Sequence, residues 1–274
     1  MDGLMRHITA CRNARLPGGR REFRLGGVAV GWAAPALAAR LLAFRDMRAE
    51  GDAIALTAPA RLPEIAAELA AEGLFSWRGE AFDVRAEPTG RVLTTVDRGA
   101  LPAFGLRAEG VHVNGLVRRG DAVFLWVARR AMDRPLDPGK RDHLVAGGIP
   151  AGFTPWRTVI KEAAEEAAIP AALAAKARPV AIITYAMERP EGLRRDRLHC
   201  FDLDLPKDFV PRAADGEAAG FELWPLAAVL DAVMSGDEFK FNVNLVLIDL
   251  FLRQGLIDPA SPDGRRLRAA LATA

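Results

Sequence analysis

The chain has 274 residues, of which 50% are hydrophobic, and this excludes a disordered chain and a small disulfide-bonded scaffold. Its 37 Lys and Arg residues nearly balance its 35 Asp and Glu residues, giving a net charge of +2. A general nucleic-acid-binding surface needs a dense basic face, so we expect no nucleic-acid partner. A local basic pocket for phosphates is still compatible with this composition.

Neither a membrane span nor a secretion signal is expected. The longest run without a charged residue, 25–39, is broken by glycines and a proline and is too short to cross a bilayer. No continuous apolar stretch follows the arginines near the N-terminus. Cys11 and Cys200 have no neighbouring Cys or His at metal-ligand spacing, which favours two unpaired thiols. We therefore expect a cytoplasmic protein without a membrane partner.

The first hundred residues alternate short strand patterns with alanine-rich helices. Helices are expected to begin at Pro35 and Pro63, because proline is favoured in the first helical turn. The segment 98–105 contains two glycines and a proline and marks a boundary. The sequence therefore predicts a small α+β accessory domain over residues 1–105 and a second domain over residues 106–274. Strand patterns in the first domain cover 28–30, 52–56, 81–84 and 92–96.

The second domain begins with a predicted β-hairpin. Apolar stretches at 111–117 and 122–128 flank a short turn. A polar loop follows, then two glycines, a loop and a helix rich in acidic residues. Helices are expected again at 225–234 and 241–252. Further strands are expected at 179–185, 198–203 and 217–224.

The acidic helix has clear start and stop signals. Thr154 is a good N-cap, and Pro155 stands at the first helical position, where its missing N–H costs nothing. Pro170 ends the helix. We therefore expect a short, well-delimited helix between a glycine-rich loop and a proline.

Three glutamates share one face of this helix. Glu162, Glu165 and Glu166 stand at i, i+3 and i+4, where like charges repel, and they lie near the C-terminal end, which the helix dipole makes unfavourable for acids. A divalent cation such as Mg²⁺ would reverse this balance, because hard cations prefer carboxylate oxygens. The alternative is a solvated acidic face. The preceding Gly147 and Gly148 favour the metal site, since glycines let the backbone approach a ligand closely.

This stretch resembles the box that defines the Nudix family. Gly147 matches the first glycine of the box, Glu162 matches the glutamate of its Arg-Glu pair, and Glu165 with Glu166 matches its Glu-Glu pair. The resemblance implies a Nudix α/β/α sandwich with a mixed β-sheet, preceded here by the small α+β domain. It also implies a hydrolase that cleaves a diphosphate bond with Mg²⁺ or Mn²⁺.

Three positions depart from the box. Phe153 stands where the family has its first glutamate, Lys161 replaces the arginine, and Ala168 replaces the glycine after the glutamate pair. In the family the first glutamate and the arginine mainly brace the loop around the helix, while the later glutamates bind metal. The departures therefore put the rigidity of the loop in question more than the binding of metal.

The resemblance extends beyond the box to one branch of the family, which has an N-terminal domain like residues 1–105 and is fused to thiamine pyrophosphokinase in some fungi. It implies hydrolysis of thiamine diphosphate, and especially of its oxidised damage products, to the monophosphates. We expect a small-molecule diphosphate as partner and a monomer or homodimer. The segments that carry this likeness are 112–115, 126–130, 160–162, 183–185, 215–217 and 239–242.

Glu162, Glu165 and Glu166 are the expected metal ligands, and we expect the loss of Glu166 to be the most damaging to catalysis. Glu217 is a further candidate, as a metal ligand or as the catalytic general base; the alternative is a turn residue at the start of a strand. We expect Glu165, Glu166 and Glu217 to be the catalytic residues.

Candidate substrate-binding residues come from five places in the second domain. An arginine pair at the end of a strand binds phosphate well, although a surface pair is an equal alternative. The single tyrosine could line a pocket for a heteroaromatic ring or pack in the core. Two polar residues before the last helix could meet a phosphate at its N-terminus. Asp142 could contact substrate or form a loop ion pair. The candidates are Arg129, Arg130, Asp142, Gly147, Gly148, Tyr185, Lys240 and Asn242.

Two other functions stay open. One is a Nudix hydrolase of another substrate, such as ADP-ribose, a dinucleotide or a coenzyme. The other is a non-catalytic binding module, for which Phe153 in place of the first glutamate is the only support. The three later glutamates argue against it, because a pure binding module would not need them.

Overall fold

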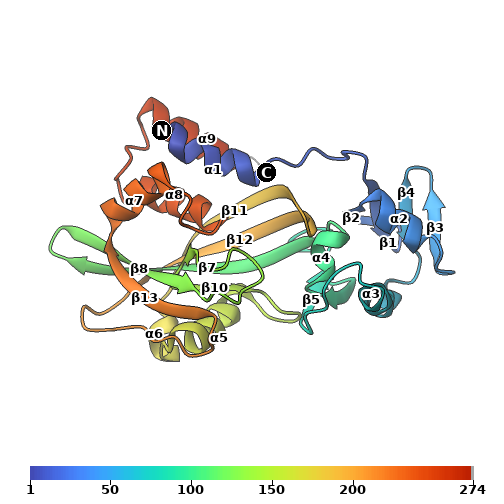
Figure 1. The fold of residues 1–274 in the computed structure, drawn as a ribbon, viewed down its shortest axis with the longest axis horizontal. Helices are drawn as coiled ribbons and strands as arrows, with labels where there is room; N and C mark the ends of the chain where they lie inside the picture. Colours follow the sequence, from blue (N-terminus) through green and yellow to red (C-terminus); the bar gives the residue numbers. More distant parts are fainter. Residues whose placement is uncertain (273–274) are drawn as a thin grey trace.

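A mixed β-sheet forms the centre of the C-terminal part of the molecule, in a computed structural model that describes residues 1–272 (Figure 1). Its strands run in the order β11-β12-β7-β8-β13, while β10 pairs with β7 and β9 with β8. The β12–β7 pair is parallel and the other pairs are antiparallel. The strands are β7 (Arg107–Arg119), β8 (Ala122–Arg130), β9 (Arg141–Asp142), β10 (Val145–Gly148), β11 (Arg178–Arg189), β12 (Gly192–Asp204) and β13 (Ala218–Pro225).

One face of this sheet is covered by the acidic helix. This helix is α5 (Pro155–Ala167), followed by the short α6 (Ala171–Ala174). Thr154 caps α5 as predicted, accepting a hydrogen bond from the backbone N–H of Arg157 at 3.2 Å. The apolar side of α5 packs on alternate residues of the sheet, which is the pattern that strand geometry dictates. The buried cluster includes Val111, Val113, Val145, Val159, Ala163, Ala167 and Phe201.

The opposite face is covered by helices from both ends of the chain. They are α1 (Asp2–Cys11), α7 (Leu226–Ser235), α8 (Val243–Arg253) and α9 (Pro262–Ala272), of which α1 and α9 were not predicted. Leu116 and Leu125 of the sheet pack against them in one buried cluster. Helices therefore cover both faces of the sheet, and the predicted α/β/α sandwich is confirmed.

The N-terminal part forms a smaller α+β unit with a core of its own, as predicted. Its main sheet has the order β2-β1-β4-β3, and a separate hairpin pairs β5 with β6. The strands are β1 (Arg21–Leu25), β2 (Val28–Ala33), β3 (Met47–Glu50), β4 (Ala53–Leu56), β5 (Ala81–Val84) and β6 (Thr94–Asp97). The helices are α2 (Pro35–Leu41), the 3₁₀ turn η1 (Pro59–Arg61), α3 (Leu62–Ala71) and α4 (Ala100–Ala103).

Helix α1 does not pack in this smaller unit, although it lies within the range 1–105 that the sequence assigned to one domain. Leu4, Ile8 and Cys11 form one face of α1 and are buried in the cluster with α7, α8 and α9. Figure 1 shows α1 beside α9, with the chain then crossing to the smaller unit. The reason is the spacing of these residues, which makes an apolar stripe that fits the helical layer of the larger unit.

The two cysteines and the lengths of the helices agree with what the sequence predicts. Cys11 and Cys200 are buried free thiols, so the predicted unpaired state is confirmed. Burial raises the pKa of the Cys11 thiol to about 12. Within residues 1–272, every helix is too short or too polar to cross a bilayer.

Helix α5 ends on a residue in an unfavourable backbone conformation. Ala168, its C-cap, has a φ of 53° in the left-handed region, and its N–H donates to the carbonyl oxygen of Ala163. This conformation costs an alanine roughly 1 kcal/mol or more, whereas glycine adopts it freely. Glycine is also the residue that the Nudix box has at this position. The strain of Ala168 therefore explains why the box favours glycine there.

We expect Ala168→Gly to raise the free energy of unfolding by about 0.5–1 kcal/mol, since relief of the left-handed alanine exceeds the added chain entropy. Urea denaturation measures the change. The control is Ala164→Gly on the exposed side of α5, which should lower stability by about 1 kcal/mol. Equal destabilisation by both substitutions would contradict the proposed strain at Ala168.

Candidate active site

The site is organised by the contact between α5 and strand β10. Glu166 is buried, with 9% of its surface exposed, and its Oε2 accepts a hydrogen bond from the backbone N–H of Ala146 at 2.9 Å. One turn earlier, Glu162 lies so close to Gly147 that a Cβ atom there would be 2.5 Å from the Glu162 carboxyl carbon. Glycine at position 147 is therefore required for the helix to pack closely on the strand.

Burial makes the charge on these glutamates costly. It raises the pKa of Glu166 to about 8; the Ala146 N–H offsets part of this effect, while the negative charges of Glu162, Asp142 and Glu217 add to it. Burial also raises the pKa of Glu162. The acids that surround Glu166 come from α5, β9 and the residue before β13. The fold therefore brings together carboxylates that repel one another unless a cation joins them.

Lys161 partly compensates these charges. Its Nζ lies 3.0 Å from Oε1 of Glu162 and 2.6 Å from Oε2 of Glu165. Burial by itself lowers the pKa of Lys161. The hydrogen bonds to Glu165 and Glu162 and the negative charges of these residues together have the larger, opposite effect, so the net pKa lies above the ordinary value. The side chain of Glu165 is half exposed and is joined to Glu162 through the shared Lys161. Lysine in place of the arginine of the Nudix box thus still forms ion pairs on the acidic face of α5.

Glu166 lines a small pocket of about 30 Å³ between β8, β9, β10 and β13. Glu217 lines the same pocket, and the Glu217 carboxylate pairs with Nη1 of Arg134 at 2.7 Å. The tertiary structure therefore places Glu217 with Glu166, although 51 positions separate them in the sequence. The pocket is lined by Ala128, Arg130, Asp142, His143, Leu144, Ala146, Glu166, Glu217, Ala218 and Phe221.

A buried ion cluster adjoins this pocket through Arg130 and Asp142. Oδ2 of Asp142 accepts hydrogen bonds from Nη1 of Arg130 at 2.8 Å and from Nζ of Lys240 at 3.2 Å. Burial by itself raises the pKa of Asp142. The positive charges of Lys240 and Arg130 outweigh this effect, so the net pKa is well below the ordinary value. Two cations and one carboxylate leave this cluster with a net charge of +1, which favours an anion such as a phosphate nearby.

Beside this cluster lies a group that the sequence did not indicate. The ligand atoms of His112, Asp142 and His143 lie within 4.8 Å of one another, a spacing that could hold a metal ion. The two Nδ1 atoms of the histidines are 2.9 Å apart, and burial lowers the pKa of His143 to about 4. Both rings are therefore neutral and share one hydrogen bond. Because Asp142 is already paired with two cations, a third cation is electrostatically less favoured here than beside Glu166.

The other predicted substrate residues lie in different surroundings. Arg129 is exposed and points away from Arg130, because neighbouring residues of a strand face opposite sides. Tyr185 lies on strand β11 and is buried against the opposite helical layer; its hydroxyl donates to Asp196 and accepts from the amide of Asn242 at 3.4 Å. Tyr185 and Asn242 line neither of the two described pockets. Gly148 lies on strand β10 under the ring of Phe82, a residue of the smaller unit.

The smaller unit holds the loop that leads into α5. The backbone carbonyl of Ala81 accepts from the N–H of Ala151 at 2.8 Å, and Oδ2 of Asp83 accepts from the N–H of Gly152 at 3.4 Å. Phe82 packs so closely on Gly148 that a Cβ there would lie 2.5 Å from the ring. In the Nudix box a glutamate braces this loop, and Phe153 replaces that glutamate here. The backbone of β5 supplies bracing that no sequence motif indicated.

The residues around Glu166 fit a divalent cation. The donors are carboxylate oxygens, which hard cations such as Mg²⁺ prefer, and burial raises the pKa values of Glu162 and Glu166, so a bound cation would favour their charged forms. Among the described residues, Lys161 is the one cation that forms an ion pair with a glutamate of α5, through Glu162 and Glu165. Glu162, Glu165 and Glu166, together with Glu217, are the residues that would hold the ion.

Comparison with known proteins identifies both parts of the chain. The NUDIX domain profile matches residues 108–243, and the profile of a domain of unknown function, DUF4743, matches residues 3–108. Nudix hydrolase 24, chloroplastic, from Arabidopsis thaliana is 41% identical over 185 residues, covering 68% of this chain and 51% of that protein. Nudix hydrolase 20, chloroplastic, from the same plant is 40% identical over 184 residues, covering 67% and 49%.

The chain thus spans about half the length of the curated relatives that it matches. Among solved structures, DR0079 from Deinococcus radiodurans is similar, with 22% identity and a TM-score of 0.48, covering 61% of this chain and 97% of that one. The glutamates on α5 lie within the matched domain, as do Asp142 and Glu217. From the profile match and the two plant relatives, we conclude that this chain belongs to the Nudix family, with its Nudix domain at residues 108–243.

Proposed function

We propose that this chain is a metal-dependent Nudix hydrolase that cleaves the phosphoanhydride bond of a small organic diphosphate. The main support is Glu166, a buried carboxylate whose pKa is raised to about 8 and which shares a pocket with Glu217. An acid in this state gains most from a bound cation, because a cation removes the cost of its buried charge. The names of the two plant relatives support the hydrolase assignment.

The proposal assigns a distinct role to each acidic residue. Glu162, Glu165 and Glu166 would hold Mg²⁺, which when bound would stabilise negative charge on phosphate oxygens and lower the pKa of a bound water. Glu217 lines the same pocket as Glu166 and serves as a further ligand or as the base that accepts a proton from water. Its pairing with Arg134 at 2.7 Å orients the carboxylate. Positioning of this kind supplies much of the rate in phosphoryl transfer.

Arg130 and Lys240 supply positive charge that attracts the phosphates of the substrate. Both side chains are held in place by hydrogen bonds to Asp142. Arg130 also donates to the carbonyl oxygen of Leu136 at 2.8 Å, so its guanidinium group holds the loop after β8 in place. The cluster keeps a net positive charge beside the pocket, where the diphosphate of a substrate would lie. Asp142 is then a positioning residue that keeps the two cations aligned.

For the substrate we propose thiamine diphosphate or its oxidised damage products. This proposal is supported by the branch-specific segments found in the sequence, including 126–130, 183–185 and 239–242. Hydrolysis of ADP-ribose, a dinucleotide or a coenzyme is the alternative, and a non-catalytic binding module is less favoured because all three later glutamates of the box are present.

A substrate panel tests this choice. We expect purified protein with Mg²⁺ to release the monophosphate from oxothiamine diphosphate and thiamine diphosphate with a kcat/KM at least about tenfold above that for ADP-ribose or dinucleotides, a difference of about 1.4 kcal/mol. Chromatography of the products identifies the bond that is cut. Preference for a nucleotide would contradict the thiamine proposal but not the hydrolase, whereas no turnover of any compound would contradict both.

Glu166→Gln should abolish this turnover while the protein stays folded, because the amide keeps the shape of the side chain but loses the negative charge that binds metal. We expect kcat to fall at least about 100-fold. Circular dichroism checks the fold. The control is Glu68→Gln on the exposed side of α3, which removes a carboxylate far from the site and should keep full activity. Undiminished turnover by Glu166→Gln would disprove the site assignment.

The raised pKa of Glu166 also predicts a pH-dependent cost in the metal-free protein. The folded pKa of about 8 exceeds the ordinary 4.5, so ionisation of this group lowers stability. The cost is absent below pH 4.5, grows by about 1.4 kcal/mol per pH unit toward pH 8, and is then constant. We expect Glu166→Gln to be more stable than the natural chain at pH 8 and about equal to it at pH 4.5, when both are measured in EDTA by denaturant unfolding.

Addition of Mg²⁺ should reverse this order at pH 8, because only the natural chain gains binding energy from the cation. Glu165→Gln is the matched comparison, since it removes a half-exposed carboxylate from the same helix and no buried one. An equal advantage of Glu166→Gln at both pH values would contradict the buried-charge explanation.

A further inference from the structure

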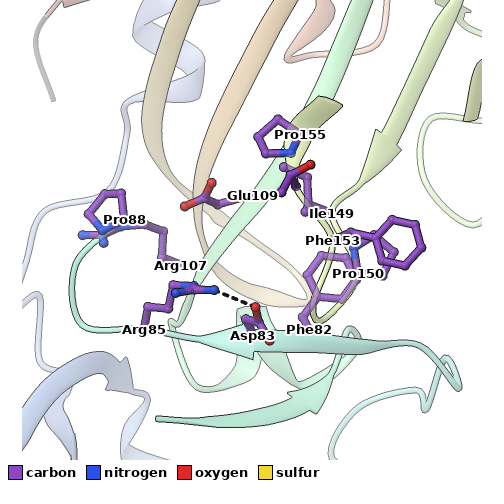
Figure 2. A pocket seen from close by; sticks show the side chains of 11 residues that line it. Phe82, Asp83, Arg85, Pro88, Arg107, Glu109, Ile149, Pro150, Phe153 and Pro155 are labelled. Carbon is purple, nitrogen blue, oxygen red and sulfur yellow. Dashed lines mark hydrogen bonds and ion pairs between the residues drawn. The ribbon is translucent and has the colours of Figure 1, made fainter. Parts of the chain in front are cut away.

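The larger described pocket, of about 250 Å³, lies where the smaller unit meets the Nudix domain. Figure 2 shows that its walls come from both parts of the chain. Hairpin β5 and the turn after it supply one wall, and the start of β7 with the loop before α5 supplies the other. The lining residues are Phe82, Asp83, Arg85, Pro88, Arg107, Glu109, Ile149, Pro150, Phe153, Thr154 and Pro155.

The geometry of this junction pocket is held by contacts between the two units. The backbone of Ala81 is hydrogen-bonded to that of Ala151 at 2.8 Å, and Phe82 packs directly on Gly148. These contacts hold the loop 149–153 against the hairpin, so the pocket is part of a packed interface. A preformed concave site between domains is a common place for a small-molecule ligand.

The lining combines flat apolar walls with polar groups of both kinds. Phe153, Ile149 and the three prolines supply apolar surface, which suits an aromatic ring. The carboxylate of Asp83 pairs with Nη2 of Arg85 at 2.9 Å, and that of Glu109 lies 2.6 Å from Nε2 of His199. The polar groups therefore include acceptors as well as donors.

Arg107 differs from the other charged residues of the pocket. Its Nη1 donates to the carbonyl oxygen of Ala86 at 3.1 Å, and its other two guanidinium nitrogens make no hydrogen bond within residues 1–272. No carboxylate of the described chain forms an ion pair with it. An uncompensated guanidinium group that lines a pocket favours a ligand with oxygen or ring-nitrogen acceptors.

The junction pocket and the glutamates are linked by strand β10. Ala146, the partner of Glu166, lines the smaller pocket, and Ile149 lines the junction pocket. Three residues of extended chain span about 10 Å, a length comparable to a diphosphate with its ester linker. Between them, Gly147 touches Glu162. Two pockets of different chemistry therefore lie along one short chain segment, which is the arrangement that an elongated ligand with two unlike ends requires.

We propose that the junction pocket binds the organic group of the substrate, a flat heterocycle with both acceptor and donor atoms on its edge, such as an amino-substituted pyrimidine. The proposal rests on the proposed hydrolase function, which assigns the diphosphate to the glutamate side. It gives residues 82–88 of the smaller unit a direct part in substrate selection. Arg107 meets acceptor atoms of the ring, while Asp83 and Glu109 accept from its amino group.

Binding of the organic group of each substrate, as the free alcohol without phosphate, tests the pocket separately from catalysis. The probes are thiamine, oxothiamine and adenosine, titrated calorimetrically into the full chain. We expect one of them to bind, and we expect Arg107→Ala, which removes the free donors, and Pro88→Trp, which fills the cavity, each to weaken its binding at least about tenfold. Arg98→Ala is the matched control, because Arg98 lies over Phe82 at the same junction without lining the pocket.

Kinetics with the preferred compound of the substrate panel gives a second readout. We expect the two pocket variants to raise KM about tenfold and to leave kcat within about twofold, whereas Glu166→Gln should lose kcat and still bind the alcohol. Absence of binding by all three alcohols, or unchanged binding and KM in both pocket variants, would overturn the proposal. Pocket-dependent binding without any hydrolysis would instead contradict the hydrolase function and leave the pocket assignment standing.

Discussion

The close packing of α5 on strand β10 is the constraint on which the rest of the site depends. Gly147 has no side chain, so Glu162 can lie directly against the strand, and the backbone N–H of Ala146 fixes the carboxylate of Glu166. A side chain at position 147 would push the helix away and break the Glu166 contact. Because β9, β10 and β13 surround the same point, the position of α5 also determines which residues share the pocket with Glu166.

This packing has an electrostatic cost that function explains better than stability does. Glu166 and Glu162 are buried side by side, and burial raises both pKa values. Lys161 compensates one side of this charge, and the ion cluster of Asp142 with Arg130 and Lys240 adds a positive charge on the other. A fold selected for stability alone would avoid such carboxylates. A cation-binding site requires them.

The two units of the chain are connected more closely than a linear division suggests. Helix α1 begins in the layer that covers the Nudix sheet, and the chain then forms the smaller unit, whose hairpin returns to hold the loop before α5. The hairpin backbone thereby takes the place of the glutamate that braces this loop elsewhere in the family. Phe153, which stands at that position here, is free to line the junction pocket instead.

Local signals in the sequence determined much of this protein. Thr154 and Pro155 set the start of α5, and the spacing of Glu162, Glu165 and Glu166 placed them on one face, because both effects depend on residues within one or two helical turns. Only the tertiary structure decided that Tyr185 lies in the core, that Asp142 is held between two cations, that Glu217 shares a pocket with Glu166, and that Phe82 reaches Gly148. These contacts join residues that are distant in the sequence, and the local periodicity that predicts helices and strands does not indicate which distant side chains meet.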